Sequence, residues 1–228
     1  MSYLSENLNE IEQRILASCN TANRSRQDVL LIAVSKTKPL SLLEEAYACG
    51  IRDFGENRVQ ELTQKADTMP EDIHWHMIGH LQKNKVKAAV RHAYMIHSVD
   101  SLSLAEAISA EAVKQSKTIN ILLEVNIAEE ESKFGYSPAE VLQDISAIAA
   151  LPNLKIKGLM TIAPFTSVAE SNRDYFRQLR ELAVDIRNKN IDNVDMEVLS
   201  MGMSGDFQVA IEEGATMVRV GTSIFGER

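Results

Sequence analysis

The stretch Val29-Leu30-Leu31-Ile32-Ala33-Val34-Ser35-Lys36, followed by Thr37-Lys38-Pro39, sets a pattern that the rest of the chain repeats. An apolar run rich in β-branched residues and bounded by a proline is typical of a buried strand. Side chains alternate along a strand, so Ile32, Val34 and Lys36 should share one face. That face is apolar until its last residue, which carries an amine. The stretch therefore predicts a buried strand that ends in a partly desolvated lysine.

Seven more strand patterns follow, and helix patterns separate them. The expected strands cover residues 29–36, 53–56, 73–78, 94–99, 119–127, 156–162, 196–200 and 217–221. The expected helices cover residues 3–19, 39–50, 58–68, 84–92, 101–114, 137–151, 167–188 and 205–213. Two capping boxes mark helix starts, Ser41 with Glu44 after Pro39, and Ser137 with Glu140 around Pro138. Asp100 or Ser101 should cap the helix that ends at Lys114.

The alternation of strands and helices predicts parallel strands joined by right-handed crossovers. Eight such units close a (β/α)₈ barrel of the TIM type, and 228 residues suit one barrel without large insertions. No linker interrupts the chain, so residues 1–228 are expected to form a single α/β domain with an extra N-terminal helix. The alternative is an open doubly wound sheet, which often carries a glycine-rich turn after its first strand. Ser35-Lys36-Thr37-Lys38-Pro39 stands in that place instead, which favours the barrel.

Composition limits the classes of function. Apolar residues make up 45% and charged residues 25%, as in ordinary soluble globular proteins. No apolar run is long enough to span a membrane, and residues 1–7 lack a signal peptide's features, so a cytoplasmic location is expected. The net charge of -8 argues against broad contact with nucleic acid or an anionic membrane. Cys19 and Cys49 lack metal or redox spacing and should be buried thiols in helices.

Lys36 is the first candidate for chemistry. Active sites of this barrel type lie at the carboxyl ends of the strands, so Lys36 should point into the mouth of the barrel. Desolvation lowers the pKa of an amine, and a neutral amine can attack an aldehyde and hold it as an imine. The ordinary alternative is a strand-end lysine whose ammonium reaches water.

Two loops at the same end favour an anion. Barrels often bind phosphate with the loops after strands seven and eight. Here those loops contain 200–204 and 221–223, which are rich in small residues, hydroxyl groups and backbone N–H donors. Helix starts near Asp206 and Ser223 would add the positive ends of helix dipoles. Ordinary turn chemistry explains each loop equally well when it is taken alone.

Arg219 and a histidine pair complete the set of candidates. Arg219 interrupts an apolar strand, and a guanidinium is rarely buried without a partner. A structural ion pair with Glu197 or Glu124 is one interpretation, and a ligand contact inside the barrel is the other. His74 and His76 would share one strand face, as a metal site requires, but they lie near the start of the strand. No metal is therefore expected.

These residues lie within longer motifs that resemble one family from the first strand to the end of the chain. The family is that of the YggS/PROSC-type pyridoxal 5′-phosphate (PLP) homeostasis proteins. The motifs are Ala33-Val34-Ser35-Lys36-Thr37, Phe54-Gly55-Glu56-Asn57, Trp75-His76-Met77-Ile78-Gly79-His80-Leu81-Gln82-Lys83-Asn84-Lys85, His97-Ser98-Val99-Asp100-Ser101, Lys157-Gly158-Leu159-Met160, Leu199-Ser200-Met201-Gly202-Met203-Ser204 and Val218-Arg219-Val220-Gly221-Thr222.

The resemblance implies a fold like the N-terminal domain of alanine racemase and a specific cofactor site. PLP would be held as an imine, or Schiff base, on Lys36. Arg219 would face the pyridine nitrogen and Asn57 would line the pocket near the ring. The phosphate would be held by the strand-seven motif around Ser200 and Met201 and by the turn at Gly221 and Thr222.

The resemblance also implies a function in intracellular PLP (vitamin B6) and amino-acid homeostasis, in which the protein holds or delivers the cofactor. Apo forms of PLP-dependent enzymes are the candidate acceptors, and a monomer is expected. A cation beside the pyridine nitrogen keeps it unprotonated, which weakens the cofactor as an electron sink. Racemases of this fold also take a tyrosine from a second domain, which is expected to be absent because the chain ends at Arg228. An enzyme is therefore not expected.

Two alternatives stay open at this point. The first is a weak PLP-dependent amino-acid racemase, which would need acid or base groups on both faces of the cofactor. The second is a barrel that acts on a sugar phosphate and needs no imine on Lys36.

Overall fold

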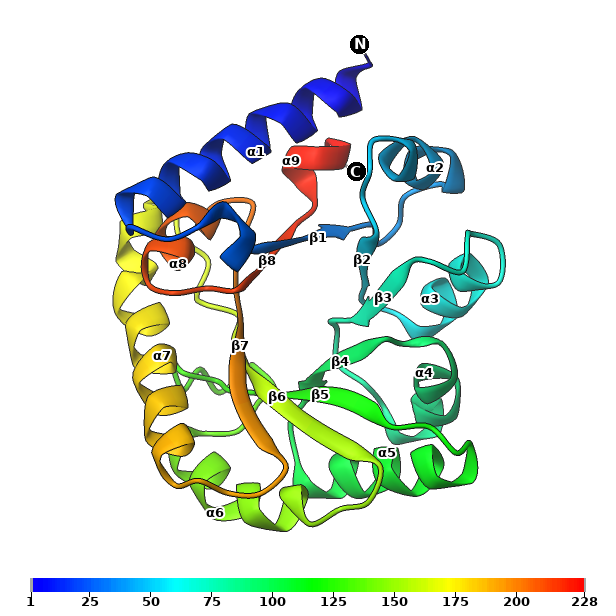
Figure 1. The fold of residues 1–228 in the computed structure, drawn as a ribbon, viewed down its shortest axis with the longest axis vertical. Coiled ribbons are helices and arrows are strands. Elements are labelled where there is room, and N and C mark those ends of the chain that lie inside the picture. Colours follow the sequence, from blue (N-terminus) through cyan, green and yellow to red (C-terminus); the bar gives the residue numbers. More distant parts are fainter. Residues whose placement is uncertain (1, 228) are drawn as a thin grey trace.

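The structure is a computed structural model and describes residues 2–227. Eight parallel strands pair in sequence order, and the last pairs with the first, which closes a barrel (Figure 1). The predicted (β/α)₈ fold with an extra N-terminal helix is confirmed. The strands are β1 (Leu30–Val34), β2 (Asp53–Glu56), β3 (His74–Met77), β4 (Met95–Val99), β5 (Ile119–Glu124), β6 (Leu154–Met160), β7 (Val194–Met203) and β8 (Met217–Val220).

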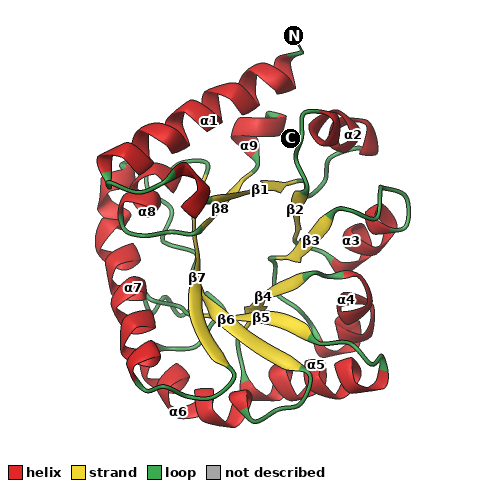
Figure 2. Cartoon of the chain, viewed as in Figure 1, coloured by secondary structure: helices red, strands yellow, loops and turns green. Residues whose placement is uncertain are grey.

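A helix follows every strand, and the helices surround the barrel (Figure 2). They are α1 (Tyr3–Thr21), which precedes β1, α2 (Leu40–Ala48), α3 (Val59–Ala66), α4 (Val86–His92), α5 (Leu102–Lys114), α6 (Pro138–Ala149), α7 (Arg173–Asn188), α8 (Phe207–Glu212) and α9 (Thr222–Phe225). Short 3₁₀ helices are η1 (Arg26–Asp28), η2 (Lys83–Lys85) and η3 (Ala169–Asn172). Within residues 2–227, none of the helices has the length and apolar character needed to cross a membrane.

The alternation of side chains along the strands separates two apolar layers. Outward residues such as Leu31 and Ala33 on β1 join a large cluster with the helices. Inward residues such as Ile32 join a small cluster inside the barrel. The outer layer buries most of the apolar surface, so it supplies most of the hydrophobic stabilisation. The inner cluster contains Ile32, Met95, Leu122, Met160 and Met217.

Several strands begin or end at residues other than those predicted. β1 ends at Val34 rather than at Lys36, because Lys36 lies in a turn and Thr37 adopts a φ of 62°. β5 ends at Glu124 rather than at residue 127, and Val125 forms an isolated bridge with Tyr136 instead. β6 begins two residues earlier than expected and β7 is longer at both ends.

Helix starts test the capping predictions. Ser137 and Glu140 form the expected capping box, with Pro138 in the first turn, and Ser101 caps α5. The predicted capping box at Ser41 is wrong, because Ser41 is already the second residue of α2 and Pro39, in an extended conformation, occupies the cap position. The prediction that both cysteines are buried is confirmed for Cys19 and wrong for Cys49, which follows the last residue of α2 and is exposed.

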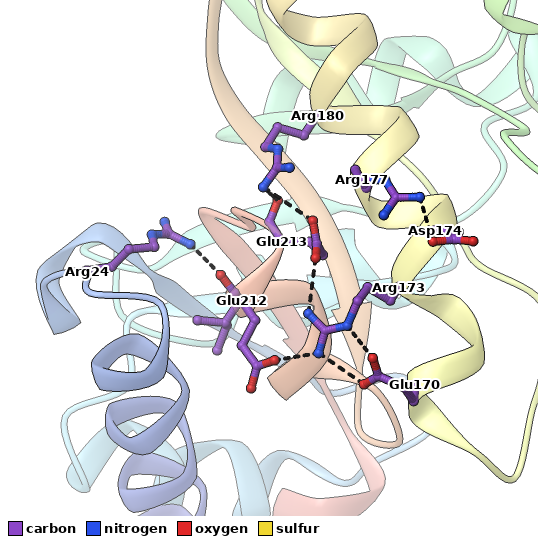
Figure 3. A network of polar contacts seen from close by, with 9 residues as sticks. Arg24, Glu170, Arg173, Asp174, Arg177, Arg180, Glu212 and Glu213 are labelled. Carbon is purple, nitrogen blue, oxygen red and sulfur yellow. Dashed lines mark hydrogen bonds and ion pairs between the residues drawn. The ribbon is translucent and has the colours of Figure 1, made fainter.

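A cluster of charged side chains joins α7 to α8 and to η3 (Figure 3). Arg173 pairs with Glu170, with Glu212 at 2.6 Å and with Glu213 at 3.0 Å. Arg180, two turns farther along α7, reaches Glu213 at 3.3 Å. Exposed ion pairs are individually weak, but a shared network holds several side chains in one arrangement. The cluster therefore fixes α8 against α7 just after β7 ends.

Gly158 on β6 tests how closely the barrel strands are packed. A methyl group added there would stand 1.8 Å from the carbonyl oxygen of Val198 on β7. Gly158→Ala should therefore push β6 from β7 and lower the free energy of unfolding by more than about 3 kcal/mol. Urea unfolding followed by circular dichroism measures the loss. Gly205→Ala is the control, since nothing lies within 4 Å of a methyl group built there, and equal losses would contradict the steric explanation.

Candidate functional site

A cavity of about 490 Å³ opens at the carboxyl ends of the strands. It draws its lining from the turns and loops after β1, β2, β3, β6, β7 and β8, as expected for an active site of this fold. The lining residues are Val34, Lys36, Thr37, Lys38, Asn57, Ile78, Ile162, Pro164, Phe165, Thr166, Asn172, Met203, Ser204, Gly205, Asp206, Arg219, Gly221, Thr222 and Gly226.

Lys36 lines this cavity and is half-buried. The turn that carries it rests on a buried ion pair, in which the Lys65 amine lies 2.7 Å from Glu56 Oε1. Lys65 also donates to the carbonyl oxygen of Ser35 at 2.8 Å, and the Ser35 hydroxyl donates to Glu56 Oε1 at 2.6 Å. Burial raises the pKa of Glu56, while its bonds with Lys65 and Ser35 oppose that shift. The residue just before Lys36 is thus held at its carbonyl and at its side chain.

Lys38 lies in the same turn but has a different environment. Its amine donates to the carbonyl oxygens of Phe225 at 3.2 Å, Gly226 at 2.9 Å and Glu227 at 2.9 Å. The Thr37 N–H donates to Glu61 Oε2 at 2.7 Å. Three carbonyl acceptors satisfy the three donors of an ammonium group. Lys38 therefore ties the turn to the C-terminal segment and holds one side of the cavity.

The loops after β7 and β8 meet at Ser204. The backbone N–H groups of Gly221 and Ser223 both donate to Ser204 Oγ, at 3.3 Å and 3.5 Å. Asp206 holds this loop in place, because it accepts from the Met203 N–H at 2.7 Å and from Asn172 Nδ2 at 2.8 Å. Converging backbone N–H groups form a concave site for an anion. An oxygen atom of an anionic ligand could take the position that the Ser204 hydroxyl holds.

Arg219 forms part of the cavity floor and is 4% exposed. It donates to Ser200 Oγ at 2.6 Å and to the carbonyl oxygen of Thr161 at 2.8 Å. Burial lowers the pKa of Arg219 to about 10, so the guanidinium stays charged at neutral pH. The ion pair with Glu197 that the sequence left open is absent from the described residues, because Glu197 lies near Lys157 at the surface.

Glu124 lies in a second, smaller pocket of about 220 Å³ beside the main cavity. The two pockets share Asn57, Ile78 and Ile162 in their linings. Burial raises the pKa of Glu124 to about 7, the negative charge of Asp100 adds to this shift, and Arg219 opposes it. A pKa of about 7 means that the carboxyl group changes its protonation state in the neutral pH range.

Asn57 lines both pockets, and the chain bends close beside it just after β3. The turn contains Gly79, where an added methyl group would stand 2.5 Å from the carbonyl oxygen of Asn57. Only a residue without a side chain fits between the two backbones. The glycine of this motif therefore sets the position of Asn57 in the cavity wall.

The structure brings most of the predicted site residues together. Ser200 lies behind Arg219 and does not line the cavity, and the Met201 side chain points outward into the layer beneath the helices. Sequence reasoning gave no role to the Glu56–Lys65 pair or to His97, although a polar residue in an apolar strand is a signal for both. Lys36, Asn57, Arg219, Gly221 and Thr222 all line the cavity.

The histidine pair at the start of β3 is engaged in hydrogen bonds. His74 and His76 both contact Asp53 Oδ1, at 3.3 Å and 3.0 Å. In the part of the chain that the structure describes, no group of three His, Cys, Asp or Glu side chains could hold a metal ion.

Comparison with known proteins identifies the family. The model of the alanine racemase N-terminal domain matches residues 7–228. A pyridoxal phosphate homeostasis protein of Aquifex aeolicus is 44% identical over 224 residues, which cover 98% of this chain and 97% of the relative. This chain belongs to the pyridoxal phosphate homeostasis protein family. The Escherichia coli protein of the same name is 37% identical over 235 residues, covering 100% of this chain and 98% of that protein.

Solved structures agree with this assignment. PipY of Synechococcus elongatus, with PLP bound, has a TM-score of 0.82 and 39% identity, covering 95% of this chain and 100% of PipY. A protein from Bifidobacterium adolescentis described as unknown has a TM-score of 0.91 and 36% identity, covering 97% of this chain and 94% of that protein. An alanine racemase of Clostridium difficile has a TM-score of 0.74 at 12% identity, covering 95% of this chain and 56% of the racemase. At that identity the likeness concerns the fold alone.

The pKa of Glu124 gives a pH-dependent prediction. Because the folded-state pKa of about 7 exceeds the ordinary glutamate value of 4.5, the stabilisation from this group is complete below 4.5 and is lost as the pH rises through 7. Glu124→Gln cannot ionise, so its stability relative to the unmodified protein should increase by up to about 3 kcal/mol between about pH 5 and about pH 8. Urea unfolding of both proteins at each pH measures this difference. A difference that does not change with pH would contradict the assignment.

Proposed function

We propose that this chain binds PLP covalently and reversibly on Lys36, and that it holds or delivers the cofactor in PLP homeostasis. The observation that carries the proposal is that an amine, an anion-binding turn and a buried cation line one cavity. Lys36 supplies the amine, the turn at Ser204 and Gly221 supplies the N–H donors, and Arg219 supplies the cation. The names of the relatives and the PLP bound in PipY support the coarser part of the proposal, which is PLP binding in PLP homeostasis.

The residues present suit this cofactor. A volume of about 490 Å³ lies within the range of small-molecule sites. The phosphate would take the N–H donors of Gly221 and Ser223, with the hydroxyls of Ser204 and Thr222 beside them. Arg219, which can only donate hydrogen bonds, would meet the lone pair of an unprotonated ring nitrogen. When bound, PLP supplies an aldehyde carbon that a neutral amine can attack, with loss of water, to form an imine.

The chain's own residues would decide how firmly the cofactor is held. The buried pair of Glu56 and Lys65 holds Ser35, so the backbone from which the Lys36 side chain starts is fixed at the edge of the cavity. Attachment to an amine is reversible, so a lysine of an apo PLP-dependent enzyme could take the aldehyde in exchange. This exchange is the delivery step that we propose.

We also propose that binding, rather than turnover, is the main activity. Arg219 keeps its charge at neutral pH, and a cation beside the ring nitrogen disfavours protonation of that nitrogen. An unprotonated ring stabilises a carbanion poorly, which limits racemisation and transamination. The arrangement thus favours a carrier of the cofactor.

Lys36→Ala tests the covalent site. The variant should lose the visible absorbance of the protein-bound imine, and borohydride reduction should leave no adduct on peptides that contain position 36. Lys38→Arg is the control in the same turn, because it removes the second amine but keeps a cation that can donate to the three backbone carbonyls. Its absorbance band should persist. A band retained in Lys36→Ala, or an adduct mapped to another lysine, would refute the assignment.

A weak amino-acid racemase is the second candidate, and Glu124 is the observation that favours it. A carboxyl group with a pKa of about 7 beside the cavity could donate or accept a proton. Solvent deuterium that enters the α-carbon of an amino acid during steady turnover would support this candidate. We expect no incorporation above the rate of free PLP, and loss of any activity in Glu124→Gln would identify the proton carrier.

A further inference from the structure

A chain of hydrogen-bonded side chains crosses the interior of the barrel. Asp53 Oδ1 lies 3.0 Å from His76 Nε2, and His76 Nδ1 lies 2.9 Å from His97 Nε2. His97 Nδ1 lies 3.0 Å from Ser200 Oγ, which accepts from Arg219 Nη1 at 2.6 Å. The members come from β2, β3, β4, β7 and β8, so the chain spans the barrel from one wall to the other.

The two ends of the chain open on different sides of the molecule. Asp53 is the first residue of β2, and 13% of its side chain is exposed beside the exposed ring of His74. Arg219 lies at the other end and lines the cavity at the carboxyl ends of the strands. Between them, His76, His97 and Ser200 are fully buried. The chain therefore connects the amino-terminal face of the barrel with the candidate cofactor site.

With both imidazole rings neutral, the chemistry of the two ends sets the direction of every hydrogen bond. A carboxylate can only accept, so His76 must carry its proton on Nε2. His76 Nδ1 then accepts from His97 Nε2–H, and His97 Nδ1 accepts from the Ser200 hydroxyl. The Ser200 oxygen is left to accept from Arg219, whose guanidinium can only donate. Four links thus contain four protons, all pointing from Arg219 toward Asp53.

Neutral imidazole rings are required for this arrangement. A second proton on either ring would oppose a donor in this arrangement, or would turn His97 Nδ1 into a donor and take away the acceptor of the Ser200 hydroxyl proton. Burial lowers the pKa of both His76 and His97, and for His97 the effects of His76 and Arg219 add to that shift. Among the described residues, the titratable or charged groups that face the two rings are Asp53 from β2, His74 from β3, Tyr94 from the loop before β4 and Arg219 from β8.

We propose that Asp53, His76 and His97 are positioning residues for Arg219. They keep the Ser200 hydroxyl donating to His97 Nδ1, so the Ser200 oxygen is always presented to the guanidinium as an acceptor. With Ser200 on one side and the carbonyl of Thr161 on the other, the guanidinium plane is fixed at the cavity floor. The inference rests on the proposed function, because the group that Arg219 would meet there is the ring of the bound cofactor. Asp53 thus acts on the site from the opposite face of the barrel.

The protein without PLP gives the first test. Long-range proton–nitrogen NMR spectra distinguish the protonated and unprotonated nitrogens of each imidazole. Both His76 and His97 should be neutral and protonated on Nε2 around pH 7. A charged ring, or an Nδ1–H form at either residue, would overturn the inference. This measurement does not depend on PLP binding, so its failure and a failure of the covalent site on Lys36 are separate results.

Paired substitutions at His97 give the second test. His97→Leu replaces the imidazole with an apolar side chain of similar size and breaks two hydrogen bonds of the chain. PLP retention should therefore fall about 10- to 100-fold, and the absorbance maximum should shift. His97→Gln can donate and accept through its amide and should restore retention to within about three-fold of the original protein. Equilibrium dialysis with absorbance spectra measures both. Unchanged retention in His97→Leu, or equal losses in the two folded variants, would overturn the inference.

Asp53 offers a pair of variants at the partly exposed end, where folding is least at risk. Asp53→Ala removes the terminal acceptor, whereas Asp53→Asn keeps a carbonyl oxygen for His76 Nε2–H. Asp53→Ala should release PLP several-fold faster and mix the two tautomers of His76, and Asp53→Asn should do neither. Borohydride trapping on Lys36 should persist in all four variants. If Asp53→Ala and Asp53→Asn behave alike, Asp53 is not a positioning residue.

Discussion

The buried guanidinium of Arg219 is the constraint on which the rest of the barrel interior depends. A charge inside a closed barrel is costly unless its donors find acceptors, and the surrounding strands are mostly apolar. Ser200 and the carbonyl of Thr161 supply those acceptors, and no carboxylate of the described residues forms an ion pair with Arg219. A serine hydroxyl serves as an acceptor reliably only if its own proton is committed elsewhere. In the proposed arrangement His97 Nδ1 accepts the hydrogen bond from that hydroxyl, which gives a reason for a histidine at an inward position of β4.

The two cations of the cavity are positioned by networks on opposite sides of the barrel wall. Lys36 depends on the outer side, where Lys65 of α3 bonds to Glu56 and to the Ser35 carbonyl. Arg219 depends on the inner side, through Ser200. These networks share no residue, so a change in one leaves the other in place. Such independence suits the proposed function, in which a covalent bond to Lys36 would form and break while Arg219 holds the ring of the cofactor.

The sequence predicted the barrel well because its evidence is local. Eight apolar runs separated by amphipathic segments are visible without knowledge of tertiary contacts, and Lys36 and Arg219 stand out because they interrupt apolar patterns. The strand ends were less predictable, since the φ of 62° at Thr37 has no strong signal in a threonine. Strand parity would have placed Met201 on the outer face beside inward Ser200. The contact between His97 and Ser200 could not be predicted, because it crosses the barrel between residues that are 103 positions apart in the sequence.

The apolar side chains inside the barrel surround the hydrogen bonds that run from Asp53 to Arg219. Three of the five residues in the inner cluster are methionines, namely Met95, Met160 and Met217. A thioether side chain is unbranched and polarisable, so it fills irregular space without a hydrogen-bonding group that would compete for the donors nearby. Branched residues, which pack well in regular layers, dominate the outer face of the strands instead. The outer apolar layer thus supplies most of the hydrophobic stabilisation. The inner apolar side chains fill the space around the hydrogen bonds that hold Arg219.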